Sequence, residues 1–322
     1  MSVELSICIP TYNRAQFLEE CLQSVLLSIT GHEDQIEIII SDNASTDNTG
    51  DIVRAIQEMH PWIRYHRNEQ NIGGDRNIYA VAAMGVGKYI WVIGDDDKIE
   101  PEAIERVLEK IRSGYGLIIC NYSVWAKDFS YVIKNTGLPL GCDEVFNNPD
   151  KLMRRIGYHV GYISSIIIKN DIFFKIPESE YLNYIDYGFP QIYAVYSGIF
   201  QHCNAIYISS ALVCNRSGNS GNYDWWKYFV KGTSLIFEAL SGKGYAKNAI
   251  IAAKHQILKE AIIPQLCSMR IRGEIDRRIH VRLMTTYYKN NWLFWLIGLP
   301  VLLVPTSIAR IGKGIVMMIR NI

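Results

Sequence analysis

The sequence has 322 residues, of which 49 % are apolar and 20 % are charged, and its formal net charge is +1. This length and apolar content allow a sizeable core, and the near-neutral charge gives no reason to expect a nucleic-acid partner. Seven cysteines are scattered without any C-x-x-C pair. That spacing and the odd number argue against a disulfide framework and favour a reduced cytosolic compartment.

The first 125 residues alternate between strand-like and helix-like segments. β-branched apolar runs predict strands at 5–12, 35–43, 63–68, 88–94 and 117–125. Helical spacing and capping residues predict helices at 14–29, 45–59, 73–84 and 100–114. This βαβα series predicts the α/β fold class, with a mainly parallel central sheet and helices on both of its faces. Residues 126–221 are less regular, but they include strand-like runs within 159–173 and 201–209 and a helical pattern within 186–200. Residues 222–290 have a helical pattern.

The C-terminal stretch 292–309 contains no charged residue, follows Lys289 and precedes three cations. It is slightly shorter than the about 20 apolar residues that a spanning helix needs, and it contains two prolines. Its paired tryptophans and basic flanks suit a lipid headgroup boundary. Residues 292–322 are therefore predicted to associate with a membrane as an interfacial or re-entrant anchor. Packing on the domain and a single membrane span are the alternatives.

Polar side chains gather where three predicted strands end. The clusters are Thr11, Tyr12, Asn13 and Arg14 after the first strand, Asp42, Asn43, Ser45, Thr46 and Asp47 after the second, and Asp95, Asp96 and Asp97 after the strand through Trp91. A glycine turn followed by Asp75, Arg76 and Asn77 adds a basic group. Ligands of parallel sheets bind at the carboxyl ends of the strands, so these clusters predict one binding site.

The aspartate triplet Asp95–Asp97 places three like charges side by side and suits a hard divalent cation. Mg²⁺ and Mn²⁺ prefer oxygen ligands, and Mg²⁺ often combines one or two carboxylates with substrate phosphates. Such a cation would neutralise the charge that develops on a diphosphate leaving group. The alternative is that the three acids cap the helix that begins near Pro101 and interact with its dipole.

Four segments in order, SICIPTYNR, IIISDNASTD, NEQNIGGDRN and YIWVIGDDDKIEP, resemble those of family 2 glycosyltransferases, and the resemblance covers roughly residues 3–125. It implies the GT-A fold, a nucleotide-diphosphate sugar as donor, transfer to an acceptor hydroxyl with inversion at the anomeric carbon, and Mn²⁺ or Mg²⁺ as cofactor. Together with the pattern of the remaining chain, it predicts a nucleotide-sugar-binding half at 1–125, an acceptor-binding half at 126–221 and a helical C-terminal region at 222–322.

The resemblance implies roles for the motif residues. The nucleotide sugar is expected to contact Thr11, Tyr12, Arg14, Asp42, Asn43, Arg76, Asp95 and Asp96. Within this set, Asp42 matches the aspartate that hydrogen-bonds the base. The family often reads D-x-D-D before x-P, and in an alignment on Pro101 the first acid is replaced by Gly94. The metal is therefore expected at Asp96 and Asp97.

An inverting transfer needs a general base that takes the proton of the acceptor hydroxyl. The resemblance places an acid just before or at the start of a helix lining the acceptor cleft. The candidates are Glu178, Glu180 and Asp186, with His159 and His202 as lesser ones. We choose Asp186, which lies just before an apolar helical pattern; a helix N-cap is its alternative role. The segment CNRSGNSGNYDWWKY is compatible with a flexible loop in which Arg216 meets the diphosphate, and an ordinary polar loop before a helix is the alternative.

The sequence thus predicts a metal-dependent inverting glycosyltransferase at the cytoplasmic face of the cell membrane. Its expected acceptor is a lipid-linked saccharide of a bacterial surface polysaccharide such as O antigen. The sequence neither indicates nor excludes a homo-oligomer. One alternative is a sugar-phosphate nucleotidyltransferase, although the N-terminal CIPTYNRAQFL lacks the early Gly-rich loop of those enzymes. The other is a non-catalytic relative that serves as a binding subunit.

Overall fold

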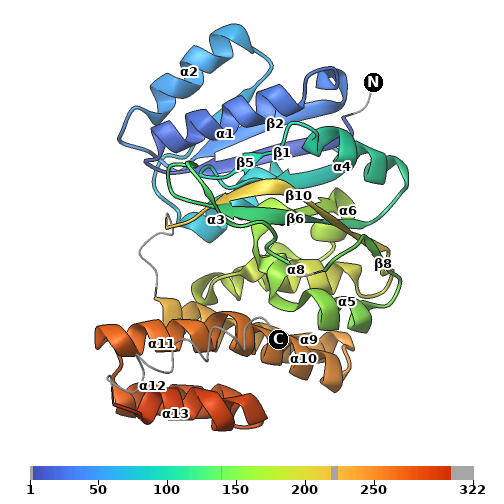
Figure 1. Cartoon of the computed structure of the whole chain (residues 1–322). Coiled ribbons are helices and arrows are strands. Elements are labelled where there is room, and N and C mark those ends of the chain that lie inside the picture. The colour runs from blue at the N-terminus through green and yellow to red at the C-terminus, as the bar shows by residue number, and fades with distance from the viewer. Residues whose placement is uncertain (1–2, 139, 219–223, 306–322) are drawn as a thin grey trace. The chain divides into compact units, whose positions relative to one another are not determined.

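The computed structural model describes residues 3–138, 140–218 and 224–305. The chain forms two compact units: residues 1–149, 159–182 and 194–222 form the first, and residues 150–158, 183–193 and 223–322 form the second. The helices and strands (Figure 1) are β1 (Leu5–Thr11), α1 (Ala15–Ser28), β2 (Ile36–Asp42), α2 (Thr49–Met59), β3 (Arg64–Arg67), α3 (Gly74–Ala83), β4 (Tyr89–Val92), β5 (Lys98–Ile99), α4 (Ala103–Arg112), β6 (Leu117–Trp125), β7 (Val132–Lys134), β8 (Glu144–Phe146), α5 (Pro149–Ile156), β9 (Ile166–Lys169), α6 (Asn170–Phe173), α7 (Glu178–Leu182), α8 (Pro190–Ile199), β10 (Ala205–Arg216), α9 (Thr233–Leu240), α10 (Lys247–Ile257), α11 (Ile263–Arg272), α12 (Arg277–Tyr288) and α13 (Leu299–Leu303).

The first unit is built on one mixed sheet. Its described strands lie in the order β3-β2-β1-β4-β9-β6-β10-β5, with β7 beside β6 and β8 beside β10. β1 runs parallel to β2 and β4, and β2 runs parallel to β3, as the βαβα pattern predicts. β9 comes from the less regular part of the sequence and lies antiparallel between β4 and β6. The predicted α/β fold class is confirmed. The sheet is more mixed than predicted, because β5, β7, β8 and β9 each pair antiparallel with a neighbouring strand.

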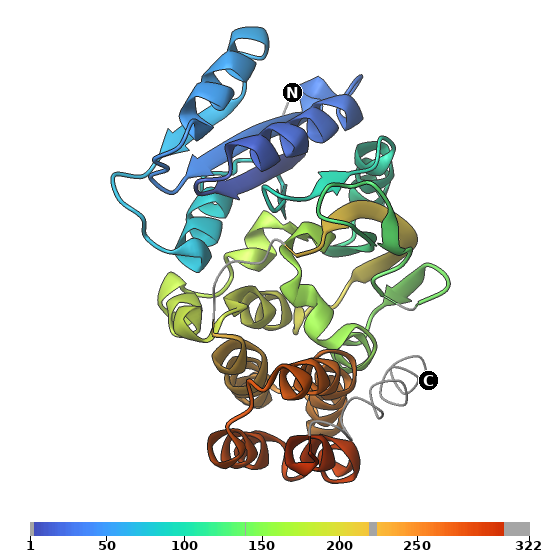
Figure 2. The ribbon, with the colours of Figure 1, turned by 60° about the vertical axis from the view of Figure 1, so that its left-hand side comes forward.

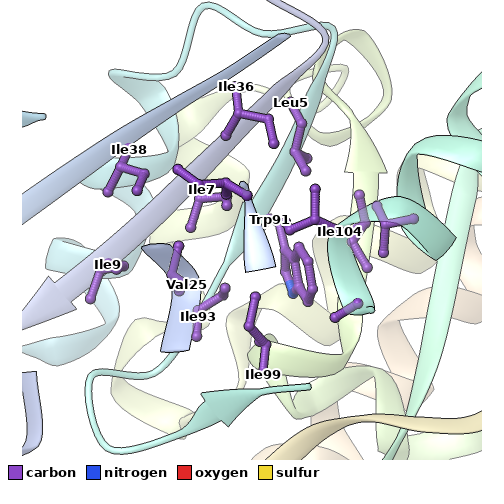
Figure 3. Packing of buried hydrophobic residues seen from close by; sticks show 14 of the residues in the cluster. Leu5, Ile7, Ile9, Val25, Ile36, Ile38, Trp91, Ile93, Ile99 and Ile104 are labelled. Atoms are coloured by element: carbon purple, nitrogen blue, oxygen red, sulfur yellow. The ribbon is translucent and has the colours of Figure 1, made fainter. Parts of the chain in front are cut away.

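Both faces of β1 are buried, which explains its nearly continuous apolar sequence. Ile7 and Ile9 belong to the core that β1 shares with Val25 of α1 and Ile104 of α4 (Figure 3). Alternate side chains of a strand point to opposite faces, so Cys8 faces the side that α3 covers. The helices therefore hold the carboxyl ends of β1, β2 and β4 at one edge of a rigid sheet.

Glu37, near the start of β2, is a buried acid whose carboxylate accepts three hydrogen bonds. Its Oε1 accepts from Ser6 Oγ and from the Val86 amide, both at 2.6 Å, and its Oε2 accepts from Arg64 Nη1 at 2.8 Å. Burial opposes the charged form, but these hydrogen bonds and the Arg64 charge outweigh it and lower the pKa of Glu37 below its usual value of 4.5. The acid thus links three neighbouring strands and the turn before β4.

Replacing Glu37 by glutamine is expected to destabilise the protein by about 1–3 kcal/mol at pH 7. The reason is that the donors of Ser6, Val86 and Arg64 lose a charged acceptor. Since the pKa of Glu37 is lower in the folded state, its contribution is full above pH 4.5 and is lost as the pH falls through the folded-state pKa. The variant should therefore lose stability less steeply below pH 4.5. Urea unfolding over this pH range measures both effects, with Glu109→Gln on α4, whose side chain is 58 % exposed, as the control. Equal stability of Glu37→Gln and wild type at pH 7 would contradict this role.

The second unit is helical over residues 225–303 of its described part, apart from short turns (Figure 2). Its core includes Ile257, Leu266, Met284 and Phe294. In the parts of the chain that the structure describes, no helix combines the length and apolar character needed to cross a membrane. The last part of the predicted membrane-associating segment, residues 306–322, lies outside the described residues.

Candidate active site at the carboxyl edge of the sheet

The ends of β1, β2 and β4 bring the predicted polar clusters together. Thr11, the last residue of β1, is in register with Asp42, the last residue of β2. Thr11 Oγ1 donates a hydrogen bond of 2.7 Å to Oδ2 of Asp95, which follows β4. The first and third clusters are therefore in direct contact, although 84 positions separate these two residues in the sequence.

Arg14 compensates part of the negative charge of the aspartate triplet. Its Nη1 lies 3.0 Å from Asp95 Oδ1 and 3.1 Å from Asp96 Oδ2. The side chain of Asp96 is 20 % exposed, whereas that of Asp95 is 6 % exposed. One arginine thus joins two adjacent carboxylates, and Asp96 is the more accessible of the two.

Asp97 is held by the protein itself. Its Oδ2 accepts hydrogen bonds from Tyr162 Oη at 2.7 Å and Ser164 Oγ at 2.6 Å. Its Oδ1 accepts from Asn215 Nδ2 and from the Arg216 amide, both at 3.2 Å. A carboxylate offers about four acceptor positions, so these donors use the acceptor capacity of Asp97.

The three carboxyl groups of the triplet lie in surroundings that favour the binding of a positive charge next to them. Burial raises the pKa of Asp95 to about 6, against the opposing effect of the Arg14 charge. Burial, together with the charge of Asp96, raises the pKa of Asp97 to about 7. A cation near these carboxylates would favour their charged forms and lower both pKa values.

The absence of a side chain at position 94 has a local structural reason. A Cβ atom on Gly94 would lie 3.1 Å from Asp96 Oδ1 and 3.2 Å from Asp97 Oδ2. The Gly94 amide also donates to Ser164 Oγ at 2.9 Å, which fixes the backbone at this point. An acid at position 94 would crowd Asp96 and Asp97 and add a fourth negative charge. The glycine therefore suits the close packing of this triplet.

Arg216 contacts the aspartate triplet, and its side chain is only 2 % exposed. Its Nη2 pairs with Glu20 Oε2 at 2.8 Å, its Nε donates to the Asp96 carbonyl at 2.8 Å, and its Nη1 donates to the Lys127 carbonyl at 2.6 Å. The guanidinium also packs 4.2 Å from the centre of the Phe129 ring. The interpretation of Arg216 as a diphosphate ligand on a flexible loop is therefore wrong, because its donors are buried and bonded within the protein.

Asp42 is fully buried at the end of β2, next to the first cluster. Its Oδ1 accepts from the Ser45 amide at 2.8 Å, and its Oδ2 accepts from Tyr65 Oη at 2.7 Å. Arg67 Nε lies 3.5 Å from the same Oδ2. These contacts fix the orientation of the carboxylate and balance its charge.

Asn43 organises the loop before α3. Its Oδ1 accepts from Asn68 Nδ2 at 3.1 Å and from the Ile72 amide at 2.9 Å, and its Nδ2 donates to Asn71 Oδ1 at 2.8 Å. This loop leads to Arg76, which is exposed in the first turn of α3. The side chain of Asn43 thus holds the segment that carries the predicted basic group.

Two further predicted residues differ in how far the structure describes them. Tyr12 follows β1 and is 42 % exposed, so its ring can be reached from solvent. Asp186 belongs to the second unit, where its backbone lies in the single 3-10 turn Ile185–Tyr187. The side chain of Asp186 is not among those described.

Sequence reasoning missed several residues that hydrogen-bond to Asp97 or pair with Arg216, which contacts the triplet. They are Glu20, Tyr162, Ser164 and Asn215. Asn215 and Arg216 stand at the carboxyl end of β10, so the rule that located the other clusters would have found them. The pattern of the sequence suggested an end of this strand near residue 209, whereas β10 continues to Arg216. Tyr162 precedes the short 3-10 helix Ile163–Ser165, which contains Ser164, and no sequence motif marks either residue.

The mixed α/β sheet, with polar clusters gathered at the carboxyl edge of its parallel strands, has the arrangement of the GT-A fold. The family model "Glycosyl transferase family 2" matches residues 6–165. Abequosyltransferase RfbV of Salmonella typhimurium (strain LT2) is 32 % identical over 277 residues, which cover 80 % of each chain. The chain therefore belongs to glycosyl transferase family 2 and is a glycosyltransferase, which argues against the nucleotidyltransferase alternative.

Other similar proteins agree with this class. The GalNAc(5)-diNAcBac-PP-undecaprenol beta-1,3-glucosyltransferase of Campylobacter jejuni is 27 % identical over 157 residues, 47 % of this chain and 48 % of the relative. S. aureus TarS 1-349 in complex with UDP-GlcNAc has a TM-score of 0.59 and 14 % identity, covering 99 % of this chain and 91 % of that one. The mannosyltransferase PcManGT from Pyrobaculum calidifontis, in complex with GDP-Man and Mn²⁺, has a TM-score of 0.58 and 14 % identity, covering 97 % and 87 %. At this identity the solved structures establish the fold alone.

Proposed function

We propose that the chain transfers a glycosyl group, with inversion, from a nucleoside-diphosphate sugar to a hydroxyl of a lipid-linked glycan in the assembly of a bacterial surface polysaccharide. The proposed location is the inner face of the cell membrane. The observation that carries the proposal is the contact of Thr11 and Arg14 with Asp95 and Asp96, which joins two family motifs at one sheet edge. The names of two relatives, an abequosyltransferase and a PP-undecaprenol glucosyltransferase, support the proposed kind of reaction.

On the donor side, exposed and buried groups have different roles. The exposed ring of Tyr12 offers a surface on which a base can stack. Asp42 and Asn43 are held by protein hydrogen bonds and shape the base pocket around them. Arg76, exposed at the start of α3, lies where both its charge and the helix dipole favour a phosphate. Complexes of the solved neighbours with UDP-GlcNAc and GDP-Man support a donor of this chemical class.

The carboxylate oxygens at this edge suit a hard divalent cation whose coordination shell is completed by oxygens of the substrate diphosphate. Among the described residues, no group of three or more His, Cys, Asp or Glu side chains is arranged to hold a metal ion. Mg²⁺ commonly binds through one or two carboxylates together with substrate phosphates, so one accessible carboxylate and a bound diphosphate would suffice. We assign the cation to Asp96, and to Asp97 only if it releases one of its protein donors. When bound, the cation supplies positive charge that stabilises the diphosphate leaving group.

We assign the general base of the transfer to Asp186. Its turn directly precedes Gly188, Phe189 and the first residue of α8. The acceptor oxygen attacks the anomeric carbon while the bond from that carbon to the diphosphate oxygen breaks. The carboxylate of Asp186 takes the hydroxyl proton, and the nucleoside diphosphate leaves with the bonding electron pair. Loss of such a base lowers a rate by about 10²–10⁴-fold.

A donor screen tests this function. Purified protein is incubated with uridine, guanosine, cytidine and thymidine diphosphate sugars, with Mn²⁺ or with EDTA, in the presence and absence of a lipid-linked acceptor. We expect turnover of one donor, its loss with EDTA and its recovery with Mn²⁺. Asp186→Asn should bind that donor normally and transfer at least about 10²-fold more slowly, whereas Asp171→Asn, an exposed acid on α6, should match wild type. The proposal fails if none of the donors binds or is turned over.

A further inference from the structure

The helical segment from Trp292 to Leu303 presents an apolar face to solvent. The segment consists of a first turn, a π-helical stretch Phe294–Gly298 and α13. Its large exposed side chains are Trp292 at 63 %, Trp295 at 50 %, Leu296 at 65 % and Leu303 at 48 % exposure. Trp295 and Leu296 lie three and four residues after Trp292, and Leu303 lies seven residues after Leu296, so the four side chains fall toward one side of the helical segment.

The opposite side of the same segment is part of the core of the second unit. Leu293, Phe294, Val301 and Leu302 are buried in it. A helix that is apolar on all sides is expected to be covered on all sides, yet only one side is covered by the described part of this unit. The exposed side is therefore an apolar surface with no polar residue between Trp292 and Pro305.

Both ends of the segment are fixed, so the apolar face is held in place. Asn291 is buried at the start, where its Oδ1 accepts from the Leu293 amide at 3.1 Å and lies 3.2 Å from His255 Nδ1. At the other end, Arg270 donates two hydrogen bonds, of 2.9 and 2.6 Å, to the Val304 carbonyl. The face is a feature of the folded unit and not a frayed end.

The surroundings of this face in the chain are basic. α12, which packs against α13, carries exposed Arg277, Arg278 and Arg282 and is followed by exposed Lys289. The chain continues beyond the described residues with three more cations, Arg310, Lys313 and Arg320, and contains no acid after Asp276. A negatively charged surface is the partner that complements this distribution.

We propose that the side formed by Trp292, Trp295, Leu296 and Leu303 inserts into the headgroup region of an anionic lipid bilayer. Tryptophan is enriched at this boundary, and interfacial helices combine an apolar side with nearby cations. A second copy of the chain is the less suitable occupant, because it would carry the same excess of cations in this region, and like charges oppose association. The inference deepens the proposed function by naming the surface that brings the enzyme to a lipid-linked acceptor, and its test uses no sugar.

Vesicle flotation of the full chain tests this surface. The vesicles contain phosphatidylethanolamine with phosphatidylglycerol, or phosphatidylcholine alone. We expect binding to the anionic vesicles, at least about tenfold weaker binding of Trp292→Gln/Leu296→Gln, and unchanged binding of Leu27→Gln/Met59→Gln, which replaces two equally exposed side chains of the first unit. Brominated lipids should quench the tryptophan fluorescence of wild type more than that of the first variant.

Three results would overturn the inference. They are the absence of vesicle binding, equal binding of Trp292→Gln/Leu296→Gln and wild type, and a dimer in sedimentation that this variant abolishes while neither protein binds vesicles. The last result would assign the face to a second copy of the chain. Because vesicle binding is measured without donor, it can succeed or fail independently of the donor screen.

Discussion

Asp96→Asn is expected to lower glycosyl transfer by about 10²–10³-fold and to leave the fold intact. Asp96 is the more accessible of the two carboxylates that Arg14 joins, and it is the residue that we assign to the cation. Asparagine keeps the size of the side chain but removes the charge that attracts the metal. Because a partly exposed ion pair contributes at most about 1 kcal/mol, the free energy of unfolding should change little. Initial rates at saturating Mn²⁺, together with urea unfolding, measure the two effects.

Two control variants make this result specific. Asp51→Asn removes a carboxylate that is 73 % exposed on α2 and should change neither rate nor stability. Asp97→Asn should instead destabilise the protein, because its amide group would face the Tyr162 and Ser164 hydroxyls that now donate to Asp97. An Asp96→Asn enzyme within threefold of wild type would refute the assignment of Asp96 to the metal.

Arg216→Met is expected to destabilise the protein by about 2–6 kcal/mol and to reduce transfer at the same time. The substitution leaves the carbonyls of Asp96 and Lys127 without their buried donor, and each such loss costs about 1–3 kcal/mol. Glu20 adds little to this cost, because Lys98 Nζ still pairs with its Oε2 at 2.9 Å. Chemical unfolding measures the stability, and donor titration shows whether the backbone of Asp96 still supports binding.

The matched control is Arg54→Met, which removes an ion pair between two exposed side chains on α2. It should change the free energy of unfolding by less than about 1 kcal/mol. Arg216→Lys should recover only part of the loss, because an ammonium group lacks the planar fork that reaches three acceptors at once. If Arg216→Met is as stable as Arg54→Met, the role of Arg216 as the support of the triplet is wrong.

The sequence predicted the parallel half of the sheet because its signals are local. Buried runs such as that of β2 and the capped helices between them follow short-range rules, and the polar clusters follow from the position of strand ends. A strand in this region is predicted by the run Ile166–Lys169, but the antiparallel direction of β9 could not be predicted in the same way. Its apolar run Ile166–Lys169 is compatible with either direction, and its place between β4 and β6 depends on pairing with segments more than 40 residues away.

In the candidate site, too, local motifs were predictable from the sequence, whereas long-range contacts were not. The motifs located Thr11, Arg14 and the aspartate triplet, since each lies at or just after the end of a strand. They did not indicate that Arg14 bridges two acids, because an ion pair across about 80 positions has no local pattern. Arg216 was misread for a related reason: its glycine-rich surroundings suggest a mobile loop, whereas tertiary contacts bury its guanidinium.

The most direct test of the account is calorimetric titration of wild type and Asp96→Asn with the nucleoside diphosphate of the accepted donor, with Mn²⁺ and with EDTA. We predict that Mn²⁺ strengthens binding to wild type at least about tenfold and that Asp96→Asn binds equally weakly in both conditions. Identical affinities of wild type with Mn²⁺ and with EDTA, or the same Mn²⁺ effect in the variant, would contradict the claim that the aspartate triplet is a metal–diphosphate site.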